Sequence, residues 1–328
     1  MGLVTIDVPL RITVELVGDS SGTTAALTAR SADIGARPEL ERVDIDLNYS
    51  NREGYDPDFL GLAVALPPLN DEQRRNAAKN SMAKGGEDPT VLPYHHFSLV
   101  MNRRRQLAYY TAVNIDGAKS KKPTRAGDKW YFDPRIAESE QIGEDLYARN
   151  DLDRGHLVRR LDPAWGTPRE ALSANNDTFH FTNCSPQHAD FNQNSETWQG
   201  IENYLLGQAT GERKKLTIFT GPVLTEEDPL YRGVRLPTHF WKIAAYVKED
   251  GNLSVLAFLL DQTELLAGLE RFDPNTWQVS VDEIVARTGL DFSALAQHEV
   301  PLGSLDALER TDEGLPRRRL VSLSRIAV

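Results

Sequence analysis

A short polar run near the middle of the 328-residue chain places a histidine next to charged residues: Asp153, Arg154, Gly155 and His156. A neutral imidazole can take a proton from water, and a guanidinium can stabilise negative charge that builds up on a phosphate group. We expect Gly155 to let the backbone bend, so that the histidine ring faces a groove. Hydrolysis of a phosphate diester needs both functions. The run also fits an ordinary surface turn, so by itself it only nominates His156 as a candidate base.

A second polar region follows downstream, and its side chains are suited to a hard cation. It contains the runs Thr182-Asn183-Cys184-Ser185-Pro186-Gln187, Phe191-Asn192-Gln193 and Trp198-Gln199-Gly200-Ile201-Glu202. One asparagine oxygen can anchor a Mg²⁺ ion that keeps most of its water, and Glu202 on the following helix could hydrogen-bond those waters. The alternative is structural: Asn183 and Asn192 as turn residues, Trp198 in the core and Glu202 on a solvated helix face.

Taken together, the order and spacing of the two regions resemble the DNA/RNA non-specific endonucleases, a family of ββα-metal (His-Me finger) nucleases that includes the Serratia and endonuclease G types. The resemblance covers roughly residues 93 to 295. It continues in the segments 216–222, 234–242 and 288–292.

The resemblance implies a role for each motif residue. His156 is the general base, and Asn192 holds the metal, Mg²⁺ or alternatively Mn²⁺. Asn183 helps to orient the base, and Glu202 stabilises the water shell of the metal. Arg125 contacts the scissile phosphate, while Asp153 and Arg154 support the base and the phosphate. The activity implied is hydrolysis of DNA and RNA with little sequence specificity, leaving 5′-phosphate ends.

The resemblance also implies an α+β fold, in which a central, mostly antiparallel sheet is flanked by helices. The ββα-metal core would carry His156 on its strand pair and Asn192 on the facing helix. Hydrophobic alternation predicts a hairpin of strands and three further strands, and helical spacing predicts two helices. The predicted strands are 97–102, 107–114, 216–220, 240–247 and 253–260, and the predicted helices are 71–82 and 197–206.

Outside this core, four parts of the chain differ in composition. Residues 3–17 alternate and are β-branched, which predicts one or two strands, and residues 18–37 form a connector rich in Ser, Thr, Ala and Gly; both belong to the first part, residues 1–40. Residues 41–92 are expected to pack on the core as an N-terminal extension. Residues 93–300 would form the nuclease domain, and residues 301–328 a C-terminal tail.

Charge is unevenly distributed along the chain, whose formal net charge is −11. Residues 93–135 hold nine Lys or Arg and three acidic residues, so that segment carries +6 and the remainder carries −17. A local basic stripe on an acidic body is compatible with a polyanion such as DNA or RNA. It is equally compatible with a solvated charged face.

Several features bear on location and control. No apolar run is long enough for a membrane span and no signal peptide is visible, which predicts a cytoplasmic protein without membrane contact, although export by a non-classical route stays open. Cys184 is the sole cysteine, so no intramolecular disulfide can form. The six other histidines, His95, His96, His180, His188, His239 and His298, are expected to be packing or surface residues.

An unprotected non-specific nuclease in the cytoplasm would attack its own genome. We therefore expect a restraint: an inhibitor or regulatory partner, an oligomeric state such as a homodimer, a proteolytic event, or delivery into another cell. The N-terminal region would suit a docking or inhibitory segment. A different class of function also stays open: a catalytically silent nucleic-acid-binding or regulatory module on the same fold.

Overall fold

The computed structural model describes residues 45–124, 129–193, 198–267, 275–302, 308–311, 314–320 and 326. The strand expected at residues 3–17 and the connector expected at 18–37 lie outside the described residues. Within the described ranges, no helix is long and apolar enough to cross a membrane.

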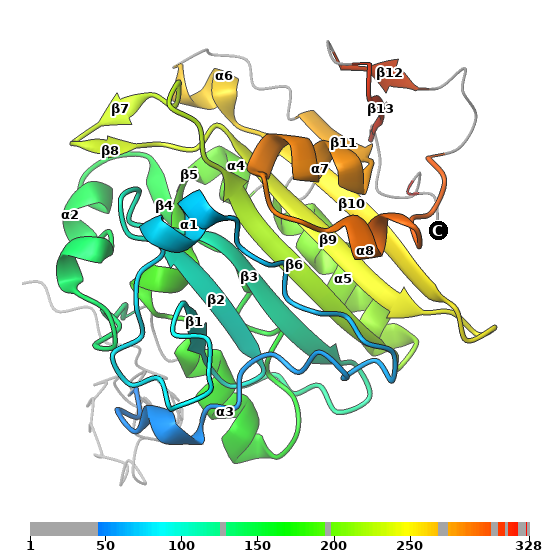
Figure 1. Ribbon diagram of the computed structural model, residues 1–328, viewed down its shortest axis with the longest axis horizontal. Helices are drawn as coiled ribbons and strands as arrows, with labels where there is room; N and C mark the ends of the chain where they lie inside the picture. Colours follow the sequence, from blue (N-terminus) through cyan, green and yellow to red (C-terminus); the bar gives the residue numbers. More distant parts are fainter. Residues whose placement is uncertain are drawn as a thin grey trace, which may run out of the picture. The chain divides into compact units, whose positions relative to one another are not determined.

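A large antiparallel sheet forms the centre of the fold (Figure 1). Every pair of neighbouring strands in it runs antiparallel. Its strand order is β1 (Val91–Pro93), β2 (Phe97–Asn102), β3 (Leu107–Asp116), β6 (Lys215–Val223), β9 (His239–Val247), β10 (Leu253–Asp261), β11 (Asn275–Val279), β13 (Pro316–Arg319) and β12 (Glu309–Arg310). All five strands predicted for the core belong to this sheet, which confirms the α+β class.

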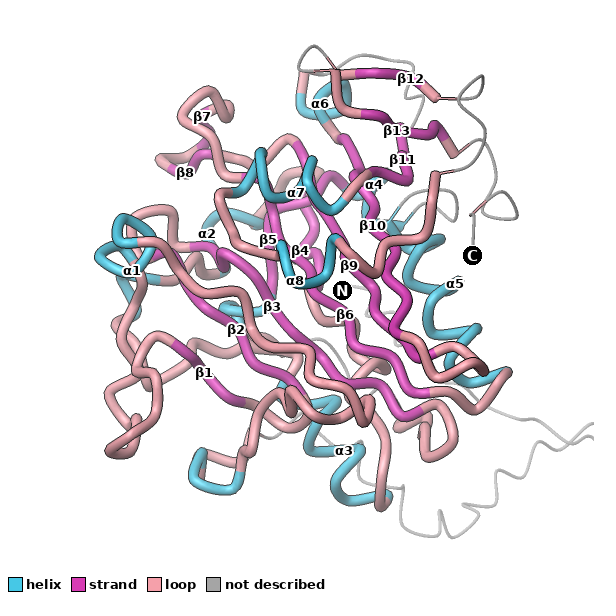
Figure 2. Tube along the Cα trace, turned by 45° about the vertical axis from the view of Figure 1, so that its right-hand side comes forward, coloured by secondary structure: helices cyan, strands magenta, loops and turns pink. Residues whose placement is uncertain are grey.

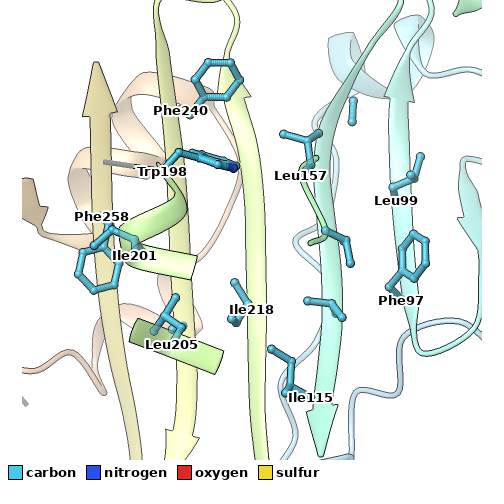
Figure 3. Close-up of a cluster of buried hydrophobic side chains, with 14 of the residues drawn as sticks. Phe97, Leu99, Ile115, Leu157, Trp198, Ile201, Leu205, Ile218, Phe240 and Phe258 are labelled. Carbon is cyan, nitrogen blue, oxygen red and sulfur yellow. The ribbon is translucent and has the colours of Figure 1, made fainter. Parts of the chain in front are cut away.

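Helices cover the two faces of the sheet. Helix α5 (Trp198–Gly211) lies on one face, whereas α7 (Val281–Thr288) and α8 (Ser293–Ala296) lie on the other (Figures 1 and 2). Trp198, Ile201 and Leu205 of α5 point toward the strands, as the helical spacing predicts, and pack against apolar side chains of the sheet (Figure 3). Helix α5 extends five residues beyond the predicted end at 206.

The hairpin prediction is confirmed, but the first predicted helix is too long. Asn70 is the N-cap of helix α1 (Asp71–Asn76), and its side chain forms a capping box with that of Gln73. It ends well before position 82, because Ala77 is extended and bridges Asn102 of β2. Pairing with the sheet satisfies this backbone in place of further helical turns, so tertiary contact overrides the local helical preference.

A small ribbon beside the sheet carries the polar motifs. Strand β4 (Leu152–His156) pairs antiparallel with β5 (Cys184–His188), and helix α4 (Ala189–Gln193) follows β5 directly. The connection between the two strands contains α3 (Pro168–Asp177), which starts at a capping box of Thr167 and Glu170. Two strands and a helix thus carry His156 and Asn192 as the ββα-metal expectation requires.

The remaining elements are short, and they lie in the connections between the longer ones. They are the helices α2 (Glu144–Tyr147) and α6 (Thr263–Leu266), the 3-10 turns Tyr49–Asn51, Glu138–Glu140 and Phe181–Asn183, and the hairpin of β7 (Leu230–Tyr231) with β8 (Val234–Arg235).

The described part of the N-terminal extension is joined to the rest by buried polar contacts. Arg52 donates to both carboxylate oxygens of Asp177, and the hydroxyl of Tyr49 lies 2.7 Å from His180 Nε2. Near the other end of the chain, Arg317, Arg318 and Arg319 pair with β11. The domain boundaries predicted after residues 40, 92 and 300 stay predictions.

Candidate active site

His156 lies at the end of β4, and Asn183 fixes the backbone that follows it. The Asn183 carbonyl oxygen accepts a hydrogen bond from the amide of Leu157. The Asn183 side chain accepts from the amide of Val158 at 3.0 Å and donates to the carbonyls of Val158 and Thr178, both at 2.9 Å. Because Asn183 is fully buried, these bonds hold the chain next to His156 in one conformation.

Aromatic rings surround the imidazole of His156. The centroid of the Trp130 ring lies 4.7 Å from it, and Phe179 meets it edge-on at 5.1 Å and 87°. Trp130 in turn packs on Phe179 and Phe181, which come from the connection between α3 and β5. Contacts of this kind restrict the rotation of the histidine ring.

Gly155 does not act as a bend, so the expectation for it was wrong. It lies in the regular part of β4, paired with Ser185, and its φ is not positive. A Cβ at this position would lie 2.0 Å from Oε1 of Gln187. The glycine therefore makes room for the buried Gln187 side chain on the neighbouring strand, a requirement that only the folded ribbon reveals.

Asp153 links the strand to the helix. Its Oδ2 atom accepts a hydrogen bond from Nδ2 of Asn192 at 2.9 Å and another from Nε2 of Gln193 at 2.8 Å. Since the amide nitrogen of Asn192 is committed to Asp153, its oxygen is the atom left for a cation. Within the described residues no three His, Cys, Asp or Glu side chains cluster to hold a metal. An amide oxygen such as that of Asn192 is a hard donor of the kind that divalent cations accept.

Glu202 reaches the site from α5 and is only 8% exposed. One carboxylate oxygen lies 3.4 Å from Nζ of Lys242, and the other lies 3.9 Å from Nε of Arg159. Burial raises the pKa of Glu202, and the charges of Lys242 and Arg159 oppose that rise. Burial also raises the pKa of the nearby Asp162 carboxyl to about 7, with a further contribution from Glu202.

These side chains meet at a pocket of about 660 Å³. Asp153, Arg154, His156, Asn192 and Glu202, all nominated from the sequence, line it. Asn183 lies beneath it and acts through the backbone. Arg125 falls outside the described residues, so its role stays a prediction. The remaining lining residues are Trp130, Arg159, Arg160, Leu161, Gln193 and Gln199.

Two cations of the pocket, Arg159 and Arg160, were not predicted from the sequence motifs. Arg159 donates to Oδ1 of Asn203 at 2.8 Å, and Arg160 donates to Oδ1 of Asn175 at 3.1 Å. Both follow His156 by three and four residues, and this proximity was the available signal. Arg154, by contrast, forms a salt bridge with Glu144 and lies over the Tyr147 ring.

The described basic residues of segment 93–135 do not form one stripe. Arg103 and Arg104 lie in the turn before β3, whereas Lys121 follows the other end of that ten-residue strand, roughly 30 Å away at about 3.3 Å per residue. Arg105 pairs with Asp228, and Arg135 is buried against Asp133. Lys121 contacts the segment that follows β4, because its amide donates to the carbonyl of Ala164.

None of the six other histidines lines the pocket. His95 pairs with Asp177, His96 with Glu170, and His180 is fully buried. Burial raises the pKa of the Cys184 thiol to about 12.

Comparison with known proteins finds similar chains. A protein of Sinorhizobium fredii, named uncharacterized protein y4fB, is 39% identical over 297 residues, which span 85% of this chain and 44% of that protein. A nuclease of a Nostoc species is 32% identical over 46% of this chain and 54% of its own length. The chain thus spans about half the length of these two relatives.

Two further proteins are more distant. Nuclease C1 of Cunninghamella echinulata is 24% identical over 58% of this chain and 77% of that protein. Among solved structures, one from a complex of EndoG with EndoGI superposes with a TM-score of 0.51 at 18% identity, covering 65% of this chain and 89% of that chain. This last likeness shows a shared fold.

Residues 74–298 match the family described as DNA/RNA non-specific endonuclease. That range includes the ribbon, helices α4 and α5 and every described residue that lines the pocket. The chain therefore belongs to the DNA/RNA non-specific endonuclease family.

Proposed function

We propose that the pocket hydrolyses phosphodiester bonds of DNA and RNA, with His156 as general base and a hydrated Mg²⁺ held by Asn192. One observation carries the proposal. The fold brings a histidine, an oriented asparagine, a buried glutamate and three arginines to the same pocket from β4, its following loop, α4 and α5. The Nostoc and Cunninghamella relatives are named nucleases, which supports the same chemistry.

In this mechanism the imidazole of His156 takes a proton from water as the water attacks phosphorus. The rings of Trp130 and Phe179 keep the imidazole in place, and Asn183 fixes the strand end that carries it. Arg159 and Arg160 supply positive charge where the phosphate becomes more negative. Arg125 and Arg154 are the further candidates for this role that family resemblance provides.

Asn192 would hold the metal through its Oδ1 atom, and Glu202 would accept hydrogen bonds from the waters around it. When bound, Mg²⁺ supplies positive charge at the phosphate and at the departing 3′ oxygen. Mn²⁺ suits the same oxygen donor.

The substrate range follows from the kind of contact. All of these groups address phosphate and none addresses base edges, so sequence specificity should be weak. We expect both DNA and RNA to be cut, with 5′-phosphate ends.

The test is cleavage of plasmid DNA and of RNA by the purified chain with Mg²⁺, with EDTA, and with His156→Ala. Metal-dependent cutting of both polymers that is lost in the variant supports the proposal. Binding of DNA without any cutting, at all Mg²⁺ and Mn²⁺ concentrations tried, would favour the silent binding module instead.

Restraint of such an activity is a second part of the proposal. In the cytoplasm, the location expected from the sequence, a non-specific nuclease needs control. We propose that residues 1–40 provide it by docking an inhibitor or by sustaining a homodimer. Deletion of residues 1–40 should raise basal cleavage or lower the mass measured by light scattering. Unchanged cleavage together with unchanged mass contradicts this.

A further inference from the structure

Lys242 occupies a position where the strand pattern calls for an apolar residue. It lies on β9 between Phe240 and Ala244, the residues that share its face of the strand, and both of these belong to the core under α5. Lys242 is nevertheless only 2% exposed. Figure 3 shows Phe240 and Trp198 side by side in this layer of the core.

The ammonium group of Lys242 has three partners in this layer. Its Nζ atom lies 3.4 Å from Oε1 of Glu202, 3.3 Å from Oγ1 of Thr220 and 3.9 Å from the centroid of the Trp198 ring. Burial lowers the pKa of the Lys242 amine, and the carboxylates of Glu202 and Asp162 counteract that effect. Lys242 itself does not line the pocket, whereas Glu202 does.

Stability alone gives a poor reason for this lysine. Taking an ammonium ion out of water is costly, and well-packed apolar residues often replace a buried ion pair without loss. A methionine could fill the same space against Trp198. The lysine is better explained by what it does to Glu202, the pocket residue that it contacts.

The two oxygens of Glu202 contact two different cations. Oε1 faces Lys242 behind the pocket, and Oε2 faces Arg159, whose side chain is 22% exposed and lines the pocket. Asp162, buried nearby, is a second carboxyl group of the cluster, and its raised pKa reflects its burial and its closeness to Glu202. Without Lys242, the carboxylate of Glu202 would keep Arg159 as its cationic partner and would lose the contact with Nζ that holds Oε1.

We propose that Lys242 is a positioning residue, which acts through Glu202 by holding its carboxylate at the pocket. The inference rests on the proposed function, in which Glu202 orders the waters around the metal. It assigns a role to a residue of the central sheet that touches neither the substrate nor the metal.

A double-mutant cycle of Lys242→Met and Glu202→Gln tests it. Groups that orient a metal site from behind typically change activity about 10- to 100-fold. We expect Lys242→Met to lower kcat by about that factor and to raise the Mg²⁺ concentration needed for half-maximal rate, with little change in KM for DNA. In the Glu202→Gln background the same change should lower kcat by less than about threefold. Equal losses of kcat in both backgrounds would overturn the proposal.

The folding of each variant has to be checked, because Lys242→Met leaves buried carboxyl groups with fewer partners. If Lys242→Met does not fold, the double variant still tests the proposal, because it removes both members of the ion pair. The kcat of the double variant should match that of Glu202→Gln alone. A much lower kcat in a folded double variant overturns the inference.

Lys215→Met provides a matched control. Lys215 also lies over an aromatic ring, that of Phe59 at 4.5 Å, on the neighbouring strand β6 and outside the pocket. Its removal should leave kcat and the Mg²⁺ requirement unchanged. Absence of cleavage by the unaltered chain would overturn the proposed function and this inference with it. Cleavage with an additive cycle would overturn the inference alone.

Discussion

Asn192 donates a hydrogen bond of 2.9 Å from its amide nitrogen to Oδ2 of Asp153, a residue 39 positions earlier in the chain. The bond joins helix α4 to strand β4 and sets the orientation of the amide. Gln193 donates to the same oxygen. Asp153 therefore governs where the oxygen of Asn192 points, and with it the place at which the proposed cation would bind.

Loss of this bond should weaken metal binding more than substrate binding. We expect Asp153→Ala to raise the Mg²⁺ concentration for half-maximal cleavage about 10- to 100-fold. The KM for DNA should change little, as measured by initial rates over a Mg²⁺ titration. Asp151→Ala, at an exposed neighbouring position, should behave like the unaltered chain. An unchanged Mg²⁺ requirement in Asp153→Ala would show that the bond does not orient the metal ligand.

Removal of the imidazole of His156 should abolish most of the activity without unfolding the chain. A general base contributes typically 10²- to 10⁴-fold, so His156→Ala should lower the single-turnover rate by about that factor. His188→Ala is the matched control, because His188 ends strand β5 of the same ribbon but does not line the pocket. Comparable losses in both variants would point to damage of the ribbon rather than to loss of a base.

Gly155→Ala should destabilise the ribbon through Gln187. The added methyl group would overlap the Gln187 side chain, and overpacking of this kind costs about 1–3 kcal/mol. Urea unfolding measures this change in the free energy of unfolding. Adding Gln187→Ala to the same chain should recover part of the lost stability. Gly207→Ala in α5 is the control, since nothing lies within 4 Å of its added Cβ. That change should be neutral or stabilising by up to about 1 kcal/mol. Equal effects of the two alanines would contradict the steric argument.

Asp177 should make stability depend on pH in the acid range. Burial would raise its pKa, but the hydrogen bond from His95 and the charge of Arg52 outweigh it and lower the pKa to about 2. A carboxyl with a lowered pKa stabilises the fold above its ordinary pKa of 3.8, and this stabilisation is lost as pH falls from there through about 2. A shift of this size corresponds to about 2–3 kcal/mol at neutral pH.

Asp177→Asn tests that dependence. The substitution should lower the free energy of unfolding at pH 7. It should also make that free energy decrease less between about pH 4 and pH 2. Urea unfolding at each pH measures both effects. Asp250→Asn, a carboxyl at the protein surface, serves as the control for acid titration in general. Parallel curves for Asp177→Asn and the unaltered chain would show that the Arg52–Asp177 pair does not produce the acid sensitivity.

The sequence by itself determined the class of fold, the central strands, the packed face of α5 and five of the residues that line the pocket. These features are encoded locally. Alternation of side chains predicts a strand, a spacing of three to four residues predicts the face of a helix, and a motif such as Asp153 to His156 is read directly from the chain. The place of Arg125 and the function of residues 1–40 are still predictions from sequence.

Only the tertiary structure decided the rest. Helix α1 ends at Asn76 because the backbone after it pairs with β2, and Gly155 is needed because Gln187 lies across the ribbon. The contact of Lys242 with Glu202 joins residues 40 positions apart. The described basic residues of segment 93–135 are divided between the two ends of β3. Each of these depends on the approach of segments distant in the chain, and that approach is set by packing of the whole sheet and its helices rather than by local preference.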